Sequence, residues 1–542
     1  MPDVSDQPAN PQHTPAKINL APEPFAHAIS LVTDRVANRL MAALILYAAI
    51  RSAFVAAFKP FWYDEVCTIL VARLPSVASI WRALQQGSDG MPPPYYLLER
   101  VAGQLTANQQ LAYRIPSILG FCCVLVCVFV FIRKRSGSVI ALICAPVPLI
   151  TILYTTYAAE ARPYSLVVAL VAVALVCYQQ APSKPWMILM GLSLALAVAM
   201  HYFAIFALAP FFLAELFLVL YARRLRLSVW FALVCSSAPL WALWPLLAKL
   251  KETYGTHYWA STSLPEVLRT YGALFNTAAT LGFAAVAVSG ALAVAAVAAL
   301  AFGLLVTTLP SFRGLRDDPK VPTLFSEHVL TLGILALPFF VFATMRITHG
   351  GMVPRYSLPA VLGIPLAMGF VLPRLDRKTL ALVAIFVFLG LADQEAGFWT
   401  SARGALLGGE TRAMHLKKFI ESAEYADLPV VASDAFDYLQ IQQYSSPEIK
   451  KRLFVMVDPP QAVTYAGTDT VDKQLLALQA FVPLHVYDFN VFISSHPRFL
   501  LYSTGDAQFD WWPVRLNRDG YVLQVLNAEK NQKVYLVRAK GD

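Results

Sequence analysis

Two adjacent carboxylates, Asp64 and Glu65, are the first residues of this 542-residue chain with a pattern suited to chemistry. They end the segment Phe-Trp-Tyr-Asp-Glu, which directly follows a long apolar run. Carboxylates at a membrane boundary are costly unless they are hydrated, paired or bound to a metal ion. An ordinary helix start is the competing interpretation, because acidic side chains near a helix N-terminus offset its dipole.

A second cluster covers residues 89–96, Asp-Gly-Met-Pro-Pro-Pro-Tyr-Tyr. Three successive prolines fix an extended backbone, which could hold Asp89 and Tyr95 against a polar group. The alternative is a proline-rich loop that only begins the following amphipathic segment.

A third cluster surrounds Glu160 and Arg162, between one apolar run and a helix that begins at Pro163. The two charges could simply pair with each other. However, Glu160 is forced to the level of the membrane surface, as Asp64 is. Two acidic sites from separate spans that converge outside the membrane indicate a catalytic base together with a metal ligand or a supporting carboxylate.

Two further pairs, His201-Tyr202 and Arg355-Tyr356, interrupt apolar runs. A guanidinium forms bidentate hydrogen bonds with phosphate, which suits Arg355 to a phosphorylated substrate, although a lone interfacial arginine often only extends to the membrane surface. His201 could be a metal ligand, but an isolated histidine is usually structural.

Composition decides the class of protein that must position these residues. Apolar residues make up 57% of the chain and charged residues only 14%, and the mean hydropathy is +0.55. A soluble fold could not bury so much apolar surface, so the sequence predicts a polytopic α-helical membrane protein. The net charge of +9 comes from basic residues in short loops between apolar runs, which argues against nucleic-acid binding. Six of the seven cysteines lie inside apolar runs, so neither a disulfide framework nor a zinc finger is expected.

The apolar runs predict about eleven spans, since a spanning helix needs ~20 mostly apolar residues. They are 37–58, 111–132, 138–157, 163–180, 185–200, 203–222, 227–248, 279–308, 327–346, 356–373 and 379–396. Basic loops follow the second, sixth, eighth and tenth spans, which all fall on one side together with the N-terminus. The positive-inside rule places that side in the cytoplasm. The candidate polar residues then occupy outward loops, which predicts one shared site at the outer face.

Three regions are predicted. Residues 1–36 are expected to form a disordered cytoplasmic tail, residues 37–400 the transmembrane domain and residues 401–542 an extracytoplasmic α/β domain. The last region carries a helical pattern from Thr411 and strand-like runs that begin near 428, 453, 499, 521 and 534, with a helical pattern at 472–482. No Gly-x-Gly-x-x-Gly occurs, so no nucleotide cofactor is expected.

The order of these motifs resembles the GT-C superfamily of integral membrane glycosyltransferases. It is most similar to the branch of protein mannosyltransferases, lipid A aminoarabinose transferases and bacterial RgtA/B/C/D-like enzymes. The motifs are Trp62-Tyr63-Asp64-Glu65, Asp89 with Pro92-Pro93-Pro94-Tyr95-Tyr96, Tyr113-Arg114-Ile115-Pro116-Ser117, Glu160-Ala-Arg162-Pro-Tyr164-Ser-Leu166, His201-Tyr202, and Arg355-Tyr356 with Pro359. The resemblance covers residues 37–400 and extends to the C-terminal region only loosely.

The resemblance implies transfer of a sugar from a polyprenyl-phosphate-linked donor to an acceptor hydroxyl on a lipid, glycan or protein, outside the cytoplasmic (inner) membrane. The catalytic candidates are Asp64, Glu65 and Glu160, with Asp64 as the base that activates the acceptor and inversion as the expected outcome. The substrate-binding candidates are Asp89, Tyr95, Arg162, His201, Tyr202, Arg355 and Tyr356. Relatives often carry His or Lys where this chain has Met91, which removes a cation or ligand from the site and leaves the use of a divalent metal ion open.

The main alternative is a lipid flippase or secondary transporter with a similar number of spans. Transporters carry charged or broken elements near the midplane, often in two related halves. Here the midplane is nearly free of charge apart from Arg51 and Glu215, and no duplicated halves are visible. A non-catalytic anchor for the C-terminal region is a third option, but it gives no reason for acidic clusters in the outward loops.

Overall fold

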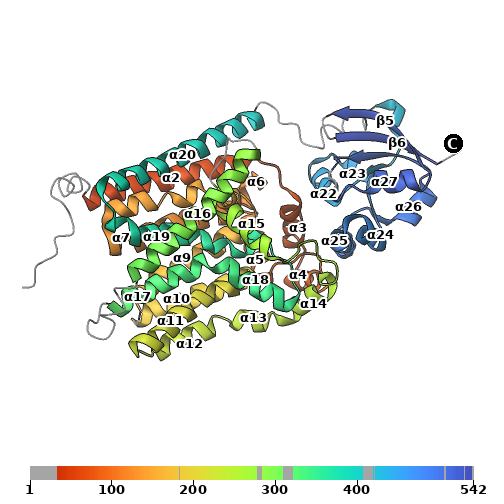
Figure 1. The fold of residues 1–542 in the computed structure, drawn as a ribbon. Coiled ribbons are helices and arrows are strands. Elements are labelled where there is room, and N and C mark those ends of the chain that lie inside the picture. Colours follow the sequence, from red (N-terminus) through yellow and green to blue (C-terminus); the bar gives the residue numbers. More distant parts are fainter. Residues whose placement is uncertain are drawn as a thin grey trace, which may run out of the picture.

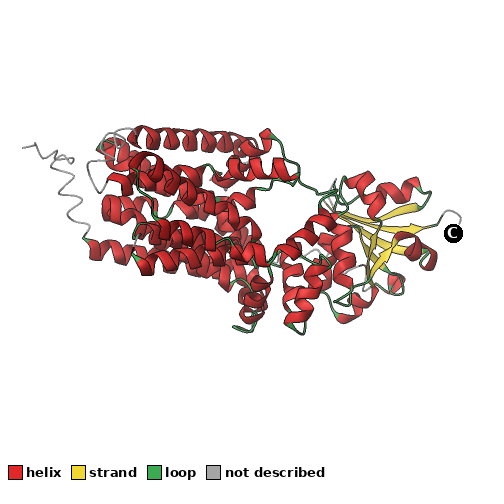
Figure 2. Cartoon of the chain, turned by 90° about the horizontal axis from the view of Figure 1, so that it is seen from below, coloured by secondary structure: helices red, strands yellow, loops and turns green. Residues whose placement is uncertain are grey.

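The computed structural model describes residues 33–181, 183–276, 283–308, 321–406, 419, 422–505, 508–529 and 532–539. A bundle of helices up to residue 406, called here the helical body, is followed by a smaller domain from residue 422 onward, called the C-terminal domain (Figure 1). The strands of the described chain all lie in the C-terminal domain (Figure 2). The predicted tail over residues 1–36 lies outside the described residues except for its last four.

By length and apolar composition, six segments of the described chain can each cross a membrane. They are Asp34–Phe58, Ile115–Ile150, Tyr202–Ala222, Gly290–Thr308, Pro354–Arg374 and Arg377–Thr400. Two bent helix pairs, Leu227–Ala242 with Trp244–Tyr254 and Leu324–Leu335 with Leu337–Thr348, raise the number to eight if each is one span. Two shorter apolar helices are Tyr164–Tyr178 and Lys184–Met200. The chain is thus a multi-pass membrane protein, and the predicted count of eleven spans is not confirmed.

The individual elements of the helical body are bounded as follows. The longer helices are α2 (Asp34–Phe58), α7 (Ile115–Cys144), α9 (Tyr164–Tyr178), α10 (Lys184–Met200), α11 (Leu208–Ala222), α15 (Leu264–Phe275), α16 (Phe283–Thr308), α17 (Val321–Leu335), α18 (Leu337–Thr348) and α20 (Arg377–Leu406). The shorter helices are α3 (Tyr63–Ala72), α4 (Val77–Gln85), α5 (Pro93–Ala102), α6 (Gln109–Ala112), α8 (Ile152–Tyr157), α12 (Leu227–Cys235), α13 (Ala238–Ala242), α14 (Trp244–Tyr254) and α19 (Gly363–Val371). The 3-10 turns are η1 (Val147–Ile150), η2 (Tyr202–Ala207), η4 (Pro354–Leu362) and η5 (Leu372–Arg374).

Helix α7 breaks at Gly137, whose φ of +81° lies in the left-handed region that favours glycine. The chain then returns through η1 and α8. At the start of α7, the Ser117 hydroxyl donates to the backbone carbonyl of Glu160 at 2.6 Å. Gly120 permits the close packing of α7 on α9, since a Cβ at this position would lie 2.9 Å from the Ser165 carbonyl oxygen. This small residue brings the first turns of α7 close to the start of α9, which directly follows the turn at 160–162.

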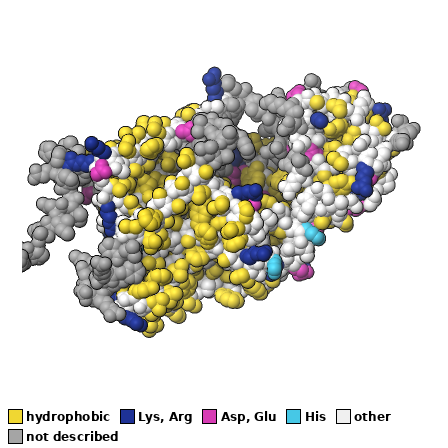
Figure 3. All heavy atoms as spheres, in the orientation of Figure 1, with side chains coloured by type: hydrophobic (Ala, Val, Ile, Leu, Met, Phe, Trp, Pro, Cys, Tyr) yellow, Lys and Arg dark blue, Asp and Glu magenta, His cyan; other side chains and the backbone are white. Residues whose placement is uncertain are grey.

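Basic side chains gather at one end of the helical body. Arg135 pairs with Glu327, and Ser138 hydrogen-bonds to Asp34 at the start of α2. The acidic cluster of residues 64–65 follows the other end of α2, roughly 37 Å away for a 25-residue helix. Apolar side chains dominate the visible surface of the body between these regions (Figure 3). The basic residues 133–135 and the acidic pair 64–65 therefore lie toward opposite ends of α2.

The C-terminal domain is built on a six-stranded sheet in the order β3-β2-β1-β4-β6-β5. Its strands are β1 (Val430–Ala432), β2 (Leu453–Val457), β3 (Val486–Asp488), β4 (Arg498–Ser503), β5 (Val522–Glu529) and β6 (Gln532–Arg538). Strands β1 to β4 pair in parallel, and Val430 of β1 lies opposite Leu453 of β2 and Leu500 of β4. Strand β6 pairs antiparallel with both β4 and β5. The five predicted strands are present; β3, only three residues long, was not predicted.

Successive residues of β1 point to opposite faces of the sheet, and each face is covered by different helices. Val430 and Ala432 share a core with α22 and α25, whereas Val431 packs with α26 and α27. The helices are η6 (Ala423–Tyr425), α22 (Ala435–Tyr444), α23 (Pro447–Arg452), α24 (Pro459–Ala466), α25 (Thr470–Gln479), α26 (Phe489–Ser495) and α27 (Trp512–Arg518). Helix α25 corresponds to the pattern predicted at 472–482, whereas most of the helical pattern from Thr411 lies outside the described residues.

Candidate active site

Helix α3 begins immediately after the turn that leaves α2, and its first turn carries both Asp64 and Glu65. Glu65 is fully buried and accepts Nε and Nη2 of Arg114, both at 2.7 Å. It also accepts the backbone N–H of Ala161 at 2.7 Å and that of Trp62 at 3.2 Å. Glu65 therefore fixes the start of α3 against α7 and against the turn at 160–162.

Asp64 is partly exposed, and its carboxylate lies between two arginines. Oδ2 of Asp64 lies 3.7 Å from Nη2 of Arg162 and 3.6 Å from Nη1 of Arg355. Its side chain retains 19% exposure, whereas that of Arg162 retains 3%. Residues far apart in sequence thus meet at the Asp64 carboxylate, whose Oδ2 atom is itself buried.

Arg162 joins the first and second predicted clusters. Its Nη1 donates to the Thr68 hydroxyl at 2.8 Å and to the backbone carbonyl of Asp64 at 3.1 Å, and it lies 3.5 Å from Oδ2 of Asp89. Burial raises the pKa of Asp89, while the charge of Arg162 and the backbone N–H of Gly90 lower it. Since a buried charge needs a partner, Arg162 and the two aspartates form one interdependent unit.

Glu160 is nearly buried, and one of its oxygens lies 2.9 Å from Nζ of Lys59. Burial raises the pKa of Glu160, and the nearby charge of Lys59 lowers it. Its second oxygen is buried and has no hydrogen-bond partner among the described residues. The carboxylates of Asp64 and Glu160 contact different cations, although the segments that carry them pack together. The ion pair considered between Glu160 and Arg162 is not among those of the described chain.

A narrow pocket lies beside Arg355 and is lined mainly by aromatic and apolar residues. They are Tyr164, Val167, His201, Phe203, Ala204, Arg355, Tyr356, Leu358 and Pro359. Tyr356 places its ring 3.8 Å from that of Phe203 and shares a 2.7 Å hydrogen bond with the Tyr258 hydroxyl. The pocket thus combines an apolar wall with a guanidinium at one point, a pattern suited to an amphipathic ligand.

His201 presents a hydrogen-bond donor to this pocket. Its Nδ1 accepts the backbone N–H of Phe203 at 3.2 Å, so the proton of a neutral ring resides on Nε2. Burial, followed by the charges of Arg162 and Arg355, lowers the pKa of His201 to about 3. Nε2 is buried without a partner in the part of the chain that the structure describes, as is the hydroxyl of the adjacent Tyr202.

Tyr95 lies on α5 and is fully buried. Its ring packs against Tyr96, with 6.2 Å between the centroids. Glu99, one helical turn further along α5, is also fully buried, and burial raises its pKa to about 8. Glu99 is a titratable group close to the site that sequence reasoning did not select.

Lys59, Thr68 and Arg114 are further site residues that were not selected. Lys59 lies two positions before the Phe-Trp-Tyr-Asp-Glu segment, so a cation within six residues of two carboxylates was a usable signal. Arg114 occurs in a quoted motif but had no acidic neighbour in sequence. Thr68 offers no sequence signal beyond its place one turn after Asp64.

The side chains present do not fit a divalent metal ion. Among the described residues no group of three or more His, Cys, Asp or Glu side chains is arranged to hold one. Asp64 and Asp89 face guanidiniums, and Glu160 faces an ammonium group. These cations already balance the carboxylates that a metal ion would need as ligands.

Comparison with known proteins addresses the fold. No protein-family model matches the sequence, and the search of curated proteins gave no match. Among solved structures, ArnT from Cupriavidus metallidurans in the apo state superimposes with a TM-score of 0.53 at 13% identity, covering 91% of this chain and 97% of ArnT. The same protein bound to undecaprenyl phosphate gives a TM-score of 0.50 at 13% identity with the same coverage. ArnT is an aminoarabinose transferase of the GT-C superfamily, so the predicted resemblance is confirmed at the level of fold.

Proposed function

We propose that this protein is a glycosyltransferase that transfers a sugar from a polyprenyl-phosphate-linked donor to an acceptor hydroxyl. The observation that carries the proposal is the position of Asp64, a partly exposed side chain whose carboxylate is held between Arg162 and Arg355 beyond the end of α2. The shared fold with ArnT, which has been solved with undecaprenyl phosphate, supports a lipid-linked donor.

In the proposed reaction, Asp64 accepts the proton of the acceptor hydroxyl as the oxygen attacks the anomeric carbon of the donor. The bond between this carbon and the lipid phosphate breaks, and the phosphate departs with the electron pair. Attack opposite to the departing phosphate inverts the anomeric centre. Products are the glycosylated acceptor and the free polyprenyl phosphate.

Arg355 and His201 are proposed to bind the phosphate. The Arg355 guanidinium supplies positive charge, and the neutral His201 ring offers an N–H donor from the same pocket. The apolar wall that includes Val167, Phe203 and Leu358 would receive the first isoprene units. Groups fixed before the reaction stabilise the leaving phosphate without reorganisation, which is why their rigid surroundings matter.

Glu65 is assigned a positioning role within this proposal, because both of its oxygens are engaged by Arg114 and by backbone N–H groups. Removing one partner from a buried pair of this kind costs about 3–5 kcal/mol. Glu160 and Lys59 remain next to the cluster, with one free carboxylate oxygen in the described structure, and are proposed to contact the donor phosphate or the acceptor.

The site is proposed to face the outside of the cytoplasmic membrane. The basic residues 133–135 lie toward the opposite end of α2, near Asn38, and the positive-inside rule favours the cytoplasm for that end. A polyprenyl phosphate has its tail in the bilayer and its phosphate at the surface, which is the level of Asp64 and Arg355.

The direct test incubates the purified protein in nanodiscs with a panel of polyprenyl-phosphate sugars and follows the release of polyprenyl phosphate. Release from at least one donor in the wild type, with none from Asp64→Asn, is the expected result. A protein that moves these lipids across vesicle membranes without cleaving any of them would instead be a flippase.

A further inference from the structure

The C-terminal domain holds the start of α3 by its backbone. The Tyr444 hydroxyl on α22 accepts the N–H of Phe61 at 2.7 Å, and Nε2 of Gln440 donates to the Phe61 carbonyl at 3.0 Å. Both backbone groups of Phe61, three residues before Asp64, are therefore bound by side chains of another domain. The ring of Tyr63 also packs on Phe436, with centroids 4.6 Å apart.

Gln474 on α25 contacts the two segments that carry Asp64 and Asp89. Its Oε1 accepts the Tyr63 hydroxyl at 2.9 Å, and its Nε2 donates to the backbone carbonyl of Ser88 at 3.2 Å. Tyr63 directly precedes Asp64, and Ser88 directly precedes Asp89. One amide group thus bridges the residues adjacent to the two aspartates that Arg162 pairs.

The chemistry of this bridge fixes its direction. A backbone carbonyl can only accept, so the amide nitrogen must face Ser88 and the amide oxygen must face Tyr63. Burial raises the pKa of the Tyr63 hydroxyl well above its usual value, which keeps it protonated as the donor. The amide of Gln474 serves both partners at once, and Asn would be shorter by one methylene.

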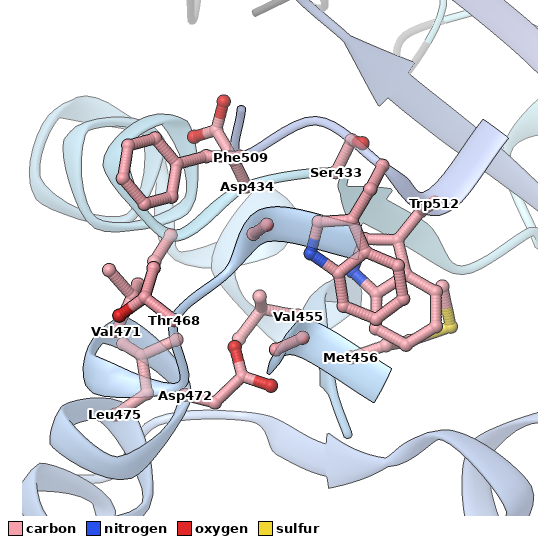
Figure 4. Close-up of a pocket in the computed structure, with 14 residues that line it drawn as sticks. Ser433, Asp434, Val455, Met456, Thr468, Val471, Asp472, Leu475, Phe509 and Trp512 are labelled. Carbon is pink, nitrogen blue, oxygen red and sulfur yellow. The ribbon is translucent and has the colours of Figure 1, made fainter. Parts of the chain in front are cut away.

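Helix α25 is itself held on both faces. Lys473 donates to the Thr253 carbonyl at 3.0 Å and pairs with Asp469 at 2.8 Å, which places this face against the helical body. The other face contributes Val471, Asp472 and Leu475 to a pocket of the C-terminal domain (Figure 4). Gln474 therefore projects from a supported helix rather than from a loose surface segment.

We propose that Gln474 is a positioning residue that holds Asp64 and Asp89 in their relative places, so that the C-terminal domain forms part of the framework of the active site. The inference rests on the proposed function for its effect on catalysis. The structural part of the inference is that Gln474 immobilises the segments around residues 63 and 88. This part does not depend on which reaction the protein catalyses.

The test compares Gln474→Ala and Gln474→Glu with Gln479→Ala, a change of the same residue type on the same helix at a position for which no contact with the helical body is described. In Gln474→Ala we expect kcat to fall about tenfold or more with little change in KM for the donor, because small displacements of reacting groups reduce the rate steeply. Gln474→Glu keeps the acceptor for Tyr63 but loses the donor to Ser88, so an intermediate loss is expected. Gln479→Ala should match the wild type.

Hydrogen exchange of peptides covering residues 60–72 and 86–92 is the second measurement. Faster exchange in both peptides of Gln474→Ala, but not of Gln479→Ala, supports the bridge. If in addition the protein turns over no donor, the proposed function is contradicted while the bridge is still supported. Unchanged exchange together with kcat within twofold of the wild type overturns the inference and leaves the proposed function intact. If Gln474→Ala does not fold, the same comparison is made with Gln474→Glu.

Discussion

Arg162 contacts Asp64 in two ways, since Nη1 donates to its backbone carbonyl at 3.1 Å and Nη2 lies 3.7 Å from its carboxylate. The first contact fixes the backbone of α3, and the second balances the charge of the carboxylate. Because Arg162 also pairs with Asp89, one buried guanidinium determines where both aspartates lie.

Replacement of Asp64 should remove the proposed base. Asp64→Asn keeps the size of the side chain but not its proton affinity, so we expect the transfer rate to fall by at least ~10²-fold, the usual contribution of a general base. The measurement is release of polyprenyl phosphate, with thermal stability as the control for folding. Activity near that of the wild type in a correctly folded variant would remove Asp64 from the mechanism.

Replacement of Arg355 should weaken the binding of the donor phosphate. Arg355→Gln loses the positive charge near Asp64 while keeping hydrogen-bonding capacity, so we expect KM for the lipid-linked donor to rise at least about tenfold. Arg269→Gln is the control, because Arg269 is 73% exposed and its ion pair is with Glu266, one turn away on the same helix. Equal effects of the two variants would contradict a phosphate role for Arg355.

Glu160→Gln tests whether the pair with Lys59 is catalytic or only structural. If the free oxygen of Glu160 contacts a substrate, we expect kcat to fall by about 10²-fold, in the range of a lost electrostatic or proton-transfer role. Lys59→Met in the same assay shows whether the cation is needed as well. A loss of less than threefold for Glu160→Gln would identify an ordinary ion pair.

The raised pKa of Glu99 predicts that stability depends on pH. In the unfolded chain this carboxyl ionises near its usual value of 4.5, whereas in the folded protein its pKa is about 8. The contribution of the neutral buried form is therefore complete below pH 4.5 and is lost as the pH rises through about 8. Thermal unfolding between pH 6 and 9 should show a falling Tm in the wild type and a flatter profile in Glu99→Gln. Glu252→Gln, on a side chain that is 70% exposed, should leave the slope unchanged.

The orientation of the chain can be tested with reporter fusions. Alkaline phosphatase fused after residue 539 should be active, because this enzyme folds only outside the cytoplasm, and a fusion in the basic loop near Arg133 should be inactive. The reverse pattern would place Asp64 on the cytoplasmic side and would contradict an externally acting enzyme.

The class of protein and five of the six strands described in the C-terminal domain could be predicted from the sequence alone. These features follow from hydropathy and residue periodicity, which act locally along the chain. The sequence also selected Asp64, Asp89, Arg162 and Arg355, because charged residues beside apolar runs are costly unless they have a partner.

Which charges pair with one another depends on the tertiary structure and could not be predicted from the sequence. Glu160 and Arg162 are close in sequence but have different partners. Glu160 pairs with Lys59, and Arg162 pairs with the two aspartates. Glu65 pairs with Arg114. A carboxylate is equally compatible with any nearby cation, so the choice depends on how α3, α7 and the turn at 160–162 pack. The contact of Gln474 with both acidic segments was equally invisible in the sequence, because more than 380 residues separate it from Ser88 and it becomes their neighbour only when the C-terminal domain docks.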